Sequence, residues 1–110
     1  MIKLVAFLKR KPGMSREEFF KYWKENHGPL AVKCFPTFKR YVQNHIIAQP
    51  GEEPEYDGIM ELWFEDIAGY EAVIDFYQSD AGKVIRDDEE RFQNLNIRPD
   101  FFVEEHIMIP

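Results

Sequence analysis

One stretch, from Ser15 to Leu30, constrains the fold more than any other part of the chain. Ser15 and Glu18 have the spacing of a capping box, in which each side chain satisfies a free backbone N–H at a helix start. Apolar positions then recur at steps of three and four on one face, which we expect to be buried: Phe20, Trp23, His27 and Leu30. His27 is therefore predicted to be an ionisable ring on a buried apolar stripe.

Gly28 and Pro29 follow His27 directly. A residue before proline avoids the α region, and proline has no N–H, so we expect the helix to stop or kink here. The break would leave unpaired carbonyls beside His27 and make room for a small ligand. The alternative is ordinary packing: a lone histidine on an apolar face is usually a core residue, and Trp23 and Phe20 are typical of a core.

The rest of the chain divides into strand patterns and helix patterns. Alternating apolar residues and a richness in β-branched and aromatic residues predict four strands, over residues 2–9, 38–48, 59–65 and 101–109. Apolar residues at helical spacing predict a helix over residues 67–77. A further helix is expected after a cap at Ser79 and Asp80, with three residues facing inward: Val84, Ile85 and Phe92. We expect the acidic run over residues 87–90 to be its solvated side.

This order of elements predicts one α+β domain over residues 1–110. A strand, a helix, two strands, a helix and a strand make a ferredoxin-like split βαβ arrangement, with helices on one face of a four-stranded antiparallel sheet. The other face of the sheet is also apolar, and no part of the chain remains to cover it. A second copy is the simplest cover, so we expect a homodimer.

Composition limits the function classes. The net charge of −6 argues against a nucleic-acid partner, and no apolar run approaches the ~20 residues that span a membrane. We expect a cytoplasmic protein, because the N-terminus lacks a signal-peptide pattern and Cys34 has no partner for a disulfide. No metal-ligand cluster and no glycine-rich phosphate loop is visible, so we expect neither metal nor flavin. Aromatic residues make up 15% of the chain, which suits a pocket for a flat ligand, a core or a dimer interface.

The sequence resembles the EthD family of dimeric α/β-barrel proteins. The longest matching stretch is FFKYWKENHGPLA, from Phe19 to Ala31. Further matches are RYVQNH from Arg40 to His45, YDGIMELWF from Tyr56 to Phe64, DEERF from Asp88 to Phe92 and VEE from Val103 to Glu105. The resemblance covers essentially the whole chain. It implies a homodimer whose two sheets pack face to face into a barrel, with one pocket per subunit between sheet and helices.

The resemblance also implies a kind of chemistry. Family relatives with known activity act on small cyclic or aromatic molecules without metal or organic cofactor, as muconolactone-type methylisomerases do. Relatives in the wider superfamily cyclise polyketides or oxidise anthrone-like rings. His27 matches an active-site histidine of such isomerases, and Tyr41 and His45 lie on the matching second strand.

Two classes of function follow as hypotheses. The first is a cofactor-free isomerase, cyclase or monooxygenase, in which His27 moves a proton on a cyclic, aromatic or polyketide-like substrate. Tyr41, Asn44 or His45 would hold a developing oxyanion, and Trp23, Trp63 and Phe92 would stack on the ring. The second is a small-molecule binding protein without turnover, including a haem-binding form with His27 as axial ligand. We further expect the His27 ring to face polar groups of the strand over residues 38–48.

Overall fold

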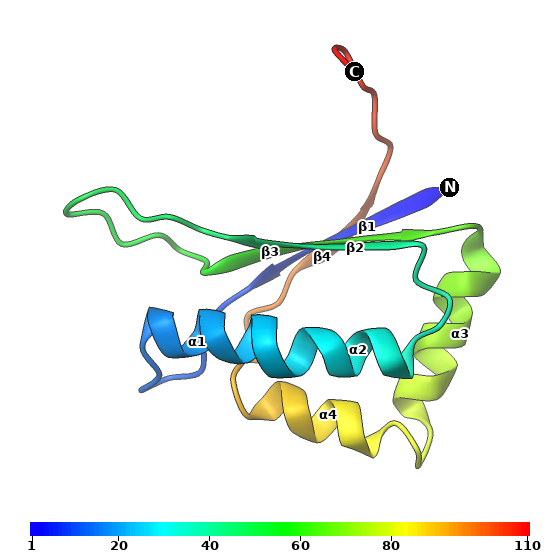
Figure 1. Ribbon diagram of the computed structural model, residues 1–110, viewed down its shortest axis with the longest axis horizontal. Helices are drawn as coiled ribbons and strands as arrows, with labels where there is room; N and C mark the ends of the chain where they lie inside the picture. The colour runs from blue at the N-terminus through cyan, green and yellow to red at the C-terminus, as the bar shows by residue number, and fades with distance from the viewer.

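A computed structural model describes all residues from Met1 to Pro110. It has two layers, an antiparallel sheet and a set of helices on one of its faces (Figure 1). The strands are β1 (Ile2–Leu8), β2 (Arg40–His45), β3 (Gly58–Phe64) and β4 (Asp100–Val103), in the spatial order β2-β3-β1-β4. The helices are α1 (Arg16–Tyr22), α2 (Gly28–Cys34), α3 (Ile67–Gln78) and α4 (Lys83–Glu90). The predicted α+β class and ferredoxin-like order of elements are confirmed.

The first helical stretch begins as predicted. The Ser15 hydroxyl accepts from the Glu18 backbone N–H at 3.1 Å, and the Glu18 carboxylate accepts from the Ser15 N–H at 3.0 Å. Two donors that would otherwise be free at the helix start are thereby satisfied.

Of the predicted stop or kink at Gly28, the stop is wrong, because the helix continues past it. A π-helical segment, η1 (Trp23–His27), joins α1 to α2, and the three form one rod beneath the sheet (Figure 1). The Gly28 N–H bonds to the Trp23 carbonyl, five residues back, and Pro29 falls in the first turn of α2, where a missing N–H is tolerated. The wider turn lets buried positions recur at steps of four: Phe19, Trp23, His27 and Ala31. Phe20 and Leu30, predicted on this stripe, are half-buried.

The second helical region also differs from its prediction. Ser79 does not cap α4; its hydroxyl accepts from the Gly82 N–H in the turn before the helix, which begins at Lys83. Val84 is exposed rather than inward. The acidic run is not a solvated side, because Asp88 and Glu89 are buried. Both lie between Ile85 and Phe92 on the buried face of α4, where charged residues need partners.

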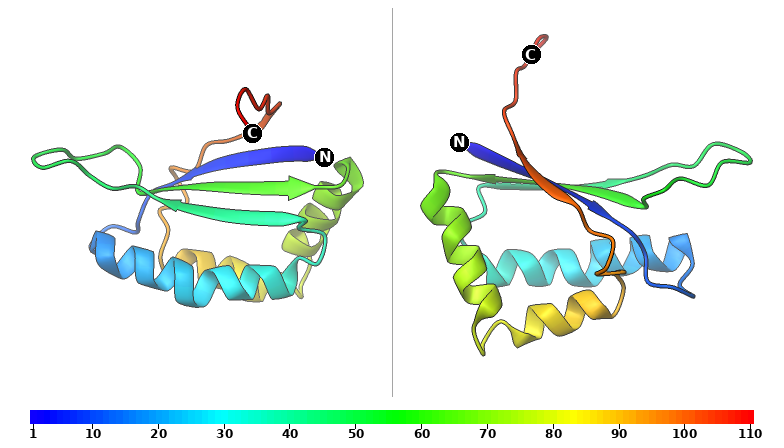
Figure 2. Two further views of the ribbon diagram at one scale, coloured as in Figure 1. Left: turned by 45° about the horizontal axis from the view of Figure 1, so that its top comes forward. Right: turned by 180° about the vertical axis from the view of Figure 1, so that it is seen from behind.

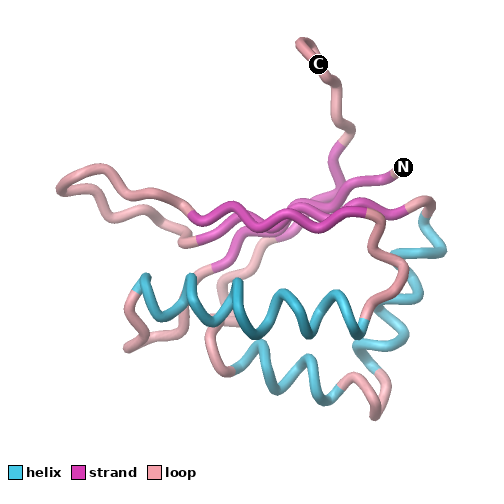
Figure 3. Tube along the Cα trace, in the orientation of Figure 1, coloured by secondary structure: helices cyan, strands magenta, loops and turns pink.

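Strand register separates the two faces of the sheet. Leu4 pairs with Leu62, which pairs with Tyr41, and all three side chains lie on the helix side. Lys3 pairs with Trp63, which pairs with Arg40, on the opposite side. Every helix packs on the first of these faces, as the tube in Figure 3 and the two views in Figure 2 show. The core and any enclosed site therefore lie between sheet and helices.

The opposite face of the sheet carries no helix. The Trp63 ring lies between the Lys3 ammonium at 4.6 Å and the Arg40 guanidinium at 4.5 Å, so this face is partly charged. Beside them is an apolar area shared by β1 and β4, in which Val5 pairs with Phe101. The predicted second apolar face is thus present over β1 and β4 and interrupted by charge toward β2. No helix of the chain has the length and hydropathy needed to cross a membrane.

Candidate functional site

A cavity of about 150 Å³ lies between the sheet and the helices. Its walls are mostly apolar side chains of β1, β3, α2 and α3. Besides Tyr70, the lining includes six side chains with polar or charged groups: His27, Tyr41, Tyr77, Glu89, Arg98 and Asp100. Asp100, at the start of β4, is the exposed residue of the lining, so the cavity opens toward this edge strand. An apolar pocket with a few polar groups is the usual form of a small-molecule site.

A larger hollow of about 500 Å³ lies at the surface over the turn at residues 9–15. Six of its nine lining residues are polar or charged, and it holds none of the predicted site residues. We therefore place the candidate site in the cavity that contains His27.

His27 is held by a carboxylate on the neighbouring helix. Its Nδ1 lies 2.9 Å from Asp88 Oδ2, and both side chains are buried. An ionised carboxylate only accepts, so Nδ1 carries the proton and donates it. The other ring nitrogen, Nε2, has no protein partner and keeps its lone pair. The prediction that strand β2 supplies the partner of His27 is wrong, because α4 supplies it.

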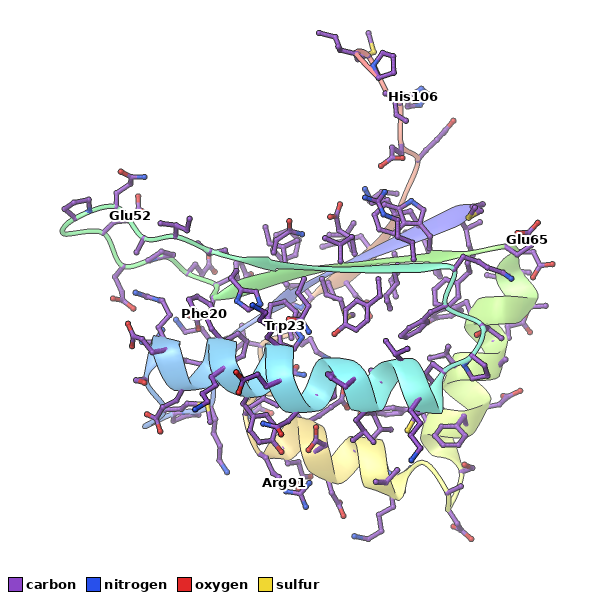
Figure 4. The ribbon with its side chains drawn as sticks, viewed as in Figure 1. Phe20, Trp23, Glu52, Glu65, Arg91 and His106 are labelled. Atoms are coloured by element: carbon purple, nitrogen blue, oxygen red, sulfur yellow. The ribbon has the colours of Figure 1, made fainter.

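Asp88 has two further donors. The Tyr22 hydroxyl donates to its Oδ1 at 2.5 Å, and Arg91 donates to the same oxygen at 3.2 Å. Arg91 lies on the outer side of α4, in contact with solvent (Figure 4). Burial tends to raise the Asp88 pKa, but the hydrogen bonds from Tyr22 and His27 outweigh it and lower the pKa from its usual value. Asp88 therefore stays ionised and fixes the tautomer of His27.

Burial lowers the pKa of His27 from its ordinary value of 6.5, and the hydrogen bond to Asp88 offsets only part of that effect. Nearby, Glu89 opposes the shift and Arg98 adds to it. The imidazole is therefore neutral near pH 7. Behind the ring lies Phe92, at a centroid distance of 4.8 Å.

A second polar group lies on the wall formed by α3 and α4. Glu89 accepts from the Tyr77 hydroxyl at 2.6 Å and from Arg98 at 2.6 Å. Burial tends to lower the Arg98 pKa, but Glu89 and Tyr77 raise it overall. The charges of Glu89 and Arg98 cancel, which leaves Asp100 at the opening. This arrangement disfavours an anionic ligand.

On the sheet side the polar residue is Tyr41. Its hydroxyl accepts from Gln43 Nε2 at 3.1 Å. The same Nε2 donates to the Trp23 carbonyl at 2.9 Å, while Gln43 Oε1 accepts from His45 Nε2 at 2.9 Å. Burial raises the pKa of Tyr41, and hydrogen bonds from Gln43 and Trp23 offset part of that rise. Tyr41 thus stays protonated at neutral pH.

The structure brings together only some of the residues that the sequence indicated. His27 and Tyr41 line the cavity. His45 does not; its ring lies between Phe20 and Trp23, at centroid distances of 4.8 and 5.0 Å.

Two of the predicted ring-stacking residues belong to the core instead. Trp23 points from the rod toward the sheet (Figure 4), and both Trp23 and Phe92 are fully buried in the cluster around Phe19. Trp23 packs against the His45 ring and Phe92 against the His27 ring, and neither lines the cavity.

Asn44 and Trp63 lie on the other face of the sheet. Asn44 pairs with Ile59 and bonds to Glu61, and Trp63 pairs with Lys3. Residues one position apart on a strand point to opposite faces, so neither can share a ligand with His27 inside one chain. The prediction that they line the same pocket does not fit this placement.

Sequence reasoning missed Asp88, Glu89 and Arg98. Asp88 and Glu89 do carry a signal, because they occupy the apolar stripe that joins Ile85 to Phe92. Like His27 in the first helical stretch, they are ionisable residues on a face that is otherwise apolar, which indicates that they need a buried partner. The chain has no group of three or more His, Cys, Asp or Glu side chains placed to hold a metal ion.

Comparison with known proteins places the chain first in a class and then in a family. Its fold is that of ferredoxin-like α+β proteins, shared with a dimeric protein of unknown function from Bacteroides fragilis (9% identity, TM-score 0.63, 94% and 95% of the two chains covered). The EthD domain model matches residues 11–96. The chain belongs to the EthD family.

Two further solved structures are similar. One is an EthD family protein from Bacillus halodurans, with 19% identity, a TM-score of 0.68, and 96% and 100% of the two chains covered. The other is a hydroxynitrile lyase from Passiflora edulis, with 14% identity, a TM-score of 0.59, and 96% and 94% covered. No curated protein matches the sequence. At these identities the likeness shows the fold, and the chemistry has to be argued from the cavity.

Proposed function

We propose that this EthD protein is an enzyme that moves a proton on a small, uncharged cyclic or aromatic molecule, with His27 as general base and no cofactor. The observation that carries the proposal is the hydrogen bond from His27 Nδ1 to Asp88, which leaves Nε2 of this cavity-lining histidine without a protein partner. A neutral imidazole oriented by a carboxylate takes a proton from an acidic carbon and returns it elsewhere. Isomerisation, cyclisation with loss of water, and proton-assisted oxidation all begin with this step.

Tyr41 completes the arrangement from the sheet. Its protonated hydroxyl donates to the oxygen on which negative charge develops when the neighbouring carbon loses its proton. Apolar side chains form the rest of the wall and exclude water from the reacting atoms. His45, predicted from the sequence to act on the substrate, acts instead on Gln43 in this proposal.

The cavity volume favours a single ring. A protein cavity of about 150 Å³ is of the size that holds benzene, whereas drug-sized ligands occupy about 300–1,000 Å³. A fused polyketide-like substrate or haem therefore fits less well than a monocyclic ketone, lactone or phenol. Among the similar structures, the Passiflora edulis protein is itself an enzyme, a hydroxynitrile lyase.

We propose in addition that the protein is a homodimer formed through the helix-free face of the sheet. That face exposes Phe101 and Val103 beside Val5 and Phe7. The similar protein from Bacteroides fragilis is described as dimeric. A partner on this face would bring Trp63 and Asn44 into the interface, away from the cavity.

The test is proton exchange on acetophenone in deuterated water. This ketone has one ring, no charge, exchangeable methyl protons and an oxygen for Tyr41. We expect wild-type protein to bind it and to speed loss of the methyl proton signal in NMR. His27→Gln should slow the exchange by at least about 10²-fold while the fold persists.

The competing function is ligand binding without turnover, and the same experiment separates the two. Binding with no exchange above buffer would make the protein a binding module. Unchanged exchange in His27→Gln would remove the catalytic role of His27, and its effect would then be confined to a lower melting temperature. No binding at all would reject the cavity as the site.

A further inference from the structure

The hydrogen bonds around Gln43 have only one consistent direction. A backbone carbonyl has no hydrogen to donate, so the contact at 2.9 Å to the Trp23 carbonyl must come from the Gln43 NH₂ group. This contact identifies the nitrogen end of the amide on chemical grounds. The oxygen end then accepts from His45 Nε2, also at 2.9 Å.

The direction of the amide decides the role of Tyr41. Gln43 Nε2 has two hydrogens, and its two contacts are the Trp23 carbonyl and the Tyr41 oxygen at 3.1 Å. Because Gln43 donates, Tyr41 accepts, and the phenol proton must point elsewhere. Tyr41 lines the cavity and has no other acceptor within hydrogen-bond distance.

A second donor lies near the same oxygen. The Trp23 indole N–H is buried without an acceptor at full hydrogen-bond geometry. The Trp23 side chain lowers the Tyr41 pKa, which is the direction expected of a donor beside the Tyr41 oxygen. The donation from Gln43 by itself occupies a lone pair of Tyr41 and leaves the phenol proton free to reach a ligand.

Several features of the chain keep this network in place. The Trp23 carbonyl also receives the Gly28 N–H that closes the π turn. A Cβ at Gly28 would lie 2.7 Å from Gln43 Nε2, so glycine leaves the space that the amide occupies. The π segment thus places the Trp23 carbonyl, and the space beside Gly28, next to the Gln43 side chain of β2.

We propose that Gln43 is a positioning residue that commits Tyr41 to donate its proton into the cavity, and that the ligand presents a carbonyl or enolate oxygen there. This inference rests on the proposed function, which places the ligand between His27 and Tyr41. It adds the direction of the hydrogen bond and the class of ligand, an uncharged monocyclic ketone whose carbonyl oxygen becomes the enolate oxygen when His27 takes a proton. Gln43 itself does not line the cavity and acts through Tyr41.

The test uses acetophenone labelled with ¹³C at the carbonyl and the variant Gln43→Glu. An ionised glutamate has no hydrogen to donate, so it accepts the Tyr41 proton and turns it away from the ligand. We expect the bound carbonyl signal of wild type to shift downfield, as hydrogen-bond donation requires. Gln43→Glu and Tyr41→Phe should each remove the shift and weaken binding by about fivefold. Gln78→Glu makes the same chemical change on the exposed end of α3 and should leave both readouts unchanged.

A double variant separates positioning from mere stability. If Gln43 acts through Tyr41, then Gln43→Glu should weaken binding no further in a Tyr41→Phe background. Independent losses in the double variant, or a full carbonyl shift in folded Gln43→Glu, would overturn the inference. Failure of wild type to bind acetophenone would instead reject the proposed function. Circular dichroism on each variant establishes that the comparison is made between folded proteins.

Discussion

His27 and Asp88 share a hydrogen bond in a setting where each requires the other. The buried carboxylate needs donors, and His27 and Tyr22 supply two of them. The buried imidazole needs a partner for its N–H, and Asp88 is the one it has. The pair therefore contributes to stability and leaves Nε2 without a protein partner.

Acid should destabilise the protein through the protonation of His27. The unfolded chain protonates His27 near the ordinary pKa of 6.5, whereas burial lowers the pKa in the folded state. Below that value the unfolded state binds more protons, so the free energy of unfolding falls as pH drops from about 6.5. The lowered pKa of Asp88 acts in the same direction at more acidic pH.

Urea unfolding of wild type and His27→Gln from about pH 7.5 to about pH 5 measures this effect. We expect a shallower pH dependence in the variant, which has no titrating ring at position 27. The free energy of unfolding of the variant at pH 7.5 should be lower by about 1–3 kcal/mol, because the buried Asp88 carboxylate loses the hydrogen bond from His27. Parallel curves would show that His27 does not titrate differently in the folded state.

At the scale of the elements, Asp57 joins three segments at one end of the sheet. Its carboxylate accepts from the Arg10 side chain at 2.6 Å, from the Arg10 N–H at 2.8 Å and from Arg16 at 3.2 Å. Asp57 is fully buried, and the segment before β3 is thereby fixed to the end of β1 and the start of α1. The long connection between β2 and β3 projects beyond this point (Figure 1).

Asp57→Asn should lower the free energy of unfolding by about 2–3 kcal/mol, because charge-assisted hydrogen bonds to a buried acceptor are lost. Glu53→Gln is the matched control. Glu53 contacts the same two arginines, but 69% of its side chain is exposed, so its loss should cost less than about 1 kcal/mol. Equal losses in chemical denaturation would contradict the role given to Asp57.

The sequence predicts the elements well where each rests on a local pattern. The capping box at Ser15, the alternation in β1 and the paired strands β2 and β3 all appear as expected. The π turn was not predictable from Gly28 and Pro29, because its cause is tertiary: it brings Trp23 and His27 to the sheet together. Helix spacing with Gly28 and Pro29 indicates only a break.

In the candidate site, too, the residues on a local pattern were predictable and those defined by tertiary contacts were not. The stripe on the first helix predicted a buried His27, and strand position indicated Tyr41. The partner Asp88 lies 61 residues from His27, and no local pattern connects two helices across that distance. Asn44 and Trp63 were misplaced because one pocket was assumed to collect residues from both faces of the sheet. Alternation along β2 already separates Asn44 from Tyr41, and only the fold shows which of the two faces carries the helices.

At the scale of the whole molecule, one sheet face has helices and the other has none (Figure 2). We expect a dimer through the helix-free face, with twice the 13.1 kDa mass of one chain in sedimentation equilibrium. Phe101→Glu places a charge in the proposed interface and should shift the protein toward monomer.

Val32→Glu is the control for this experiment. Val32 lies on the outer side of α2 and is as exposed in one chain as Phe101, at 57% against 56%. Its replacement should leave the dimer intact. A wild-type mass of 13.1 kDa, or equal dissociation of both variants, would show that the sheet face is not an interface.

We propose that His27 presents a neutral, unprotonated Nε2 to the cavity because Asp88 holds the proton on Nδ1. Long-range ¹H–¹⁵N correlation NMR of the histidine rings measures this directly, with His27→Gln assigning the signals. We expect a protonated Nδ1, an unprotonated Nε2 and a titration midpoint below 6.5. A ring protonated on Nε2 at neutral pH, or a midpoint above 6.5, would contradict the account.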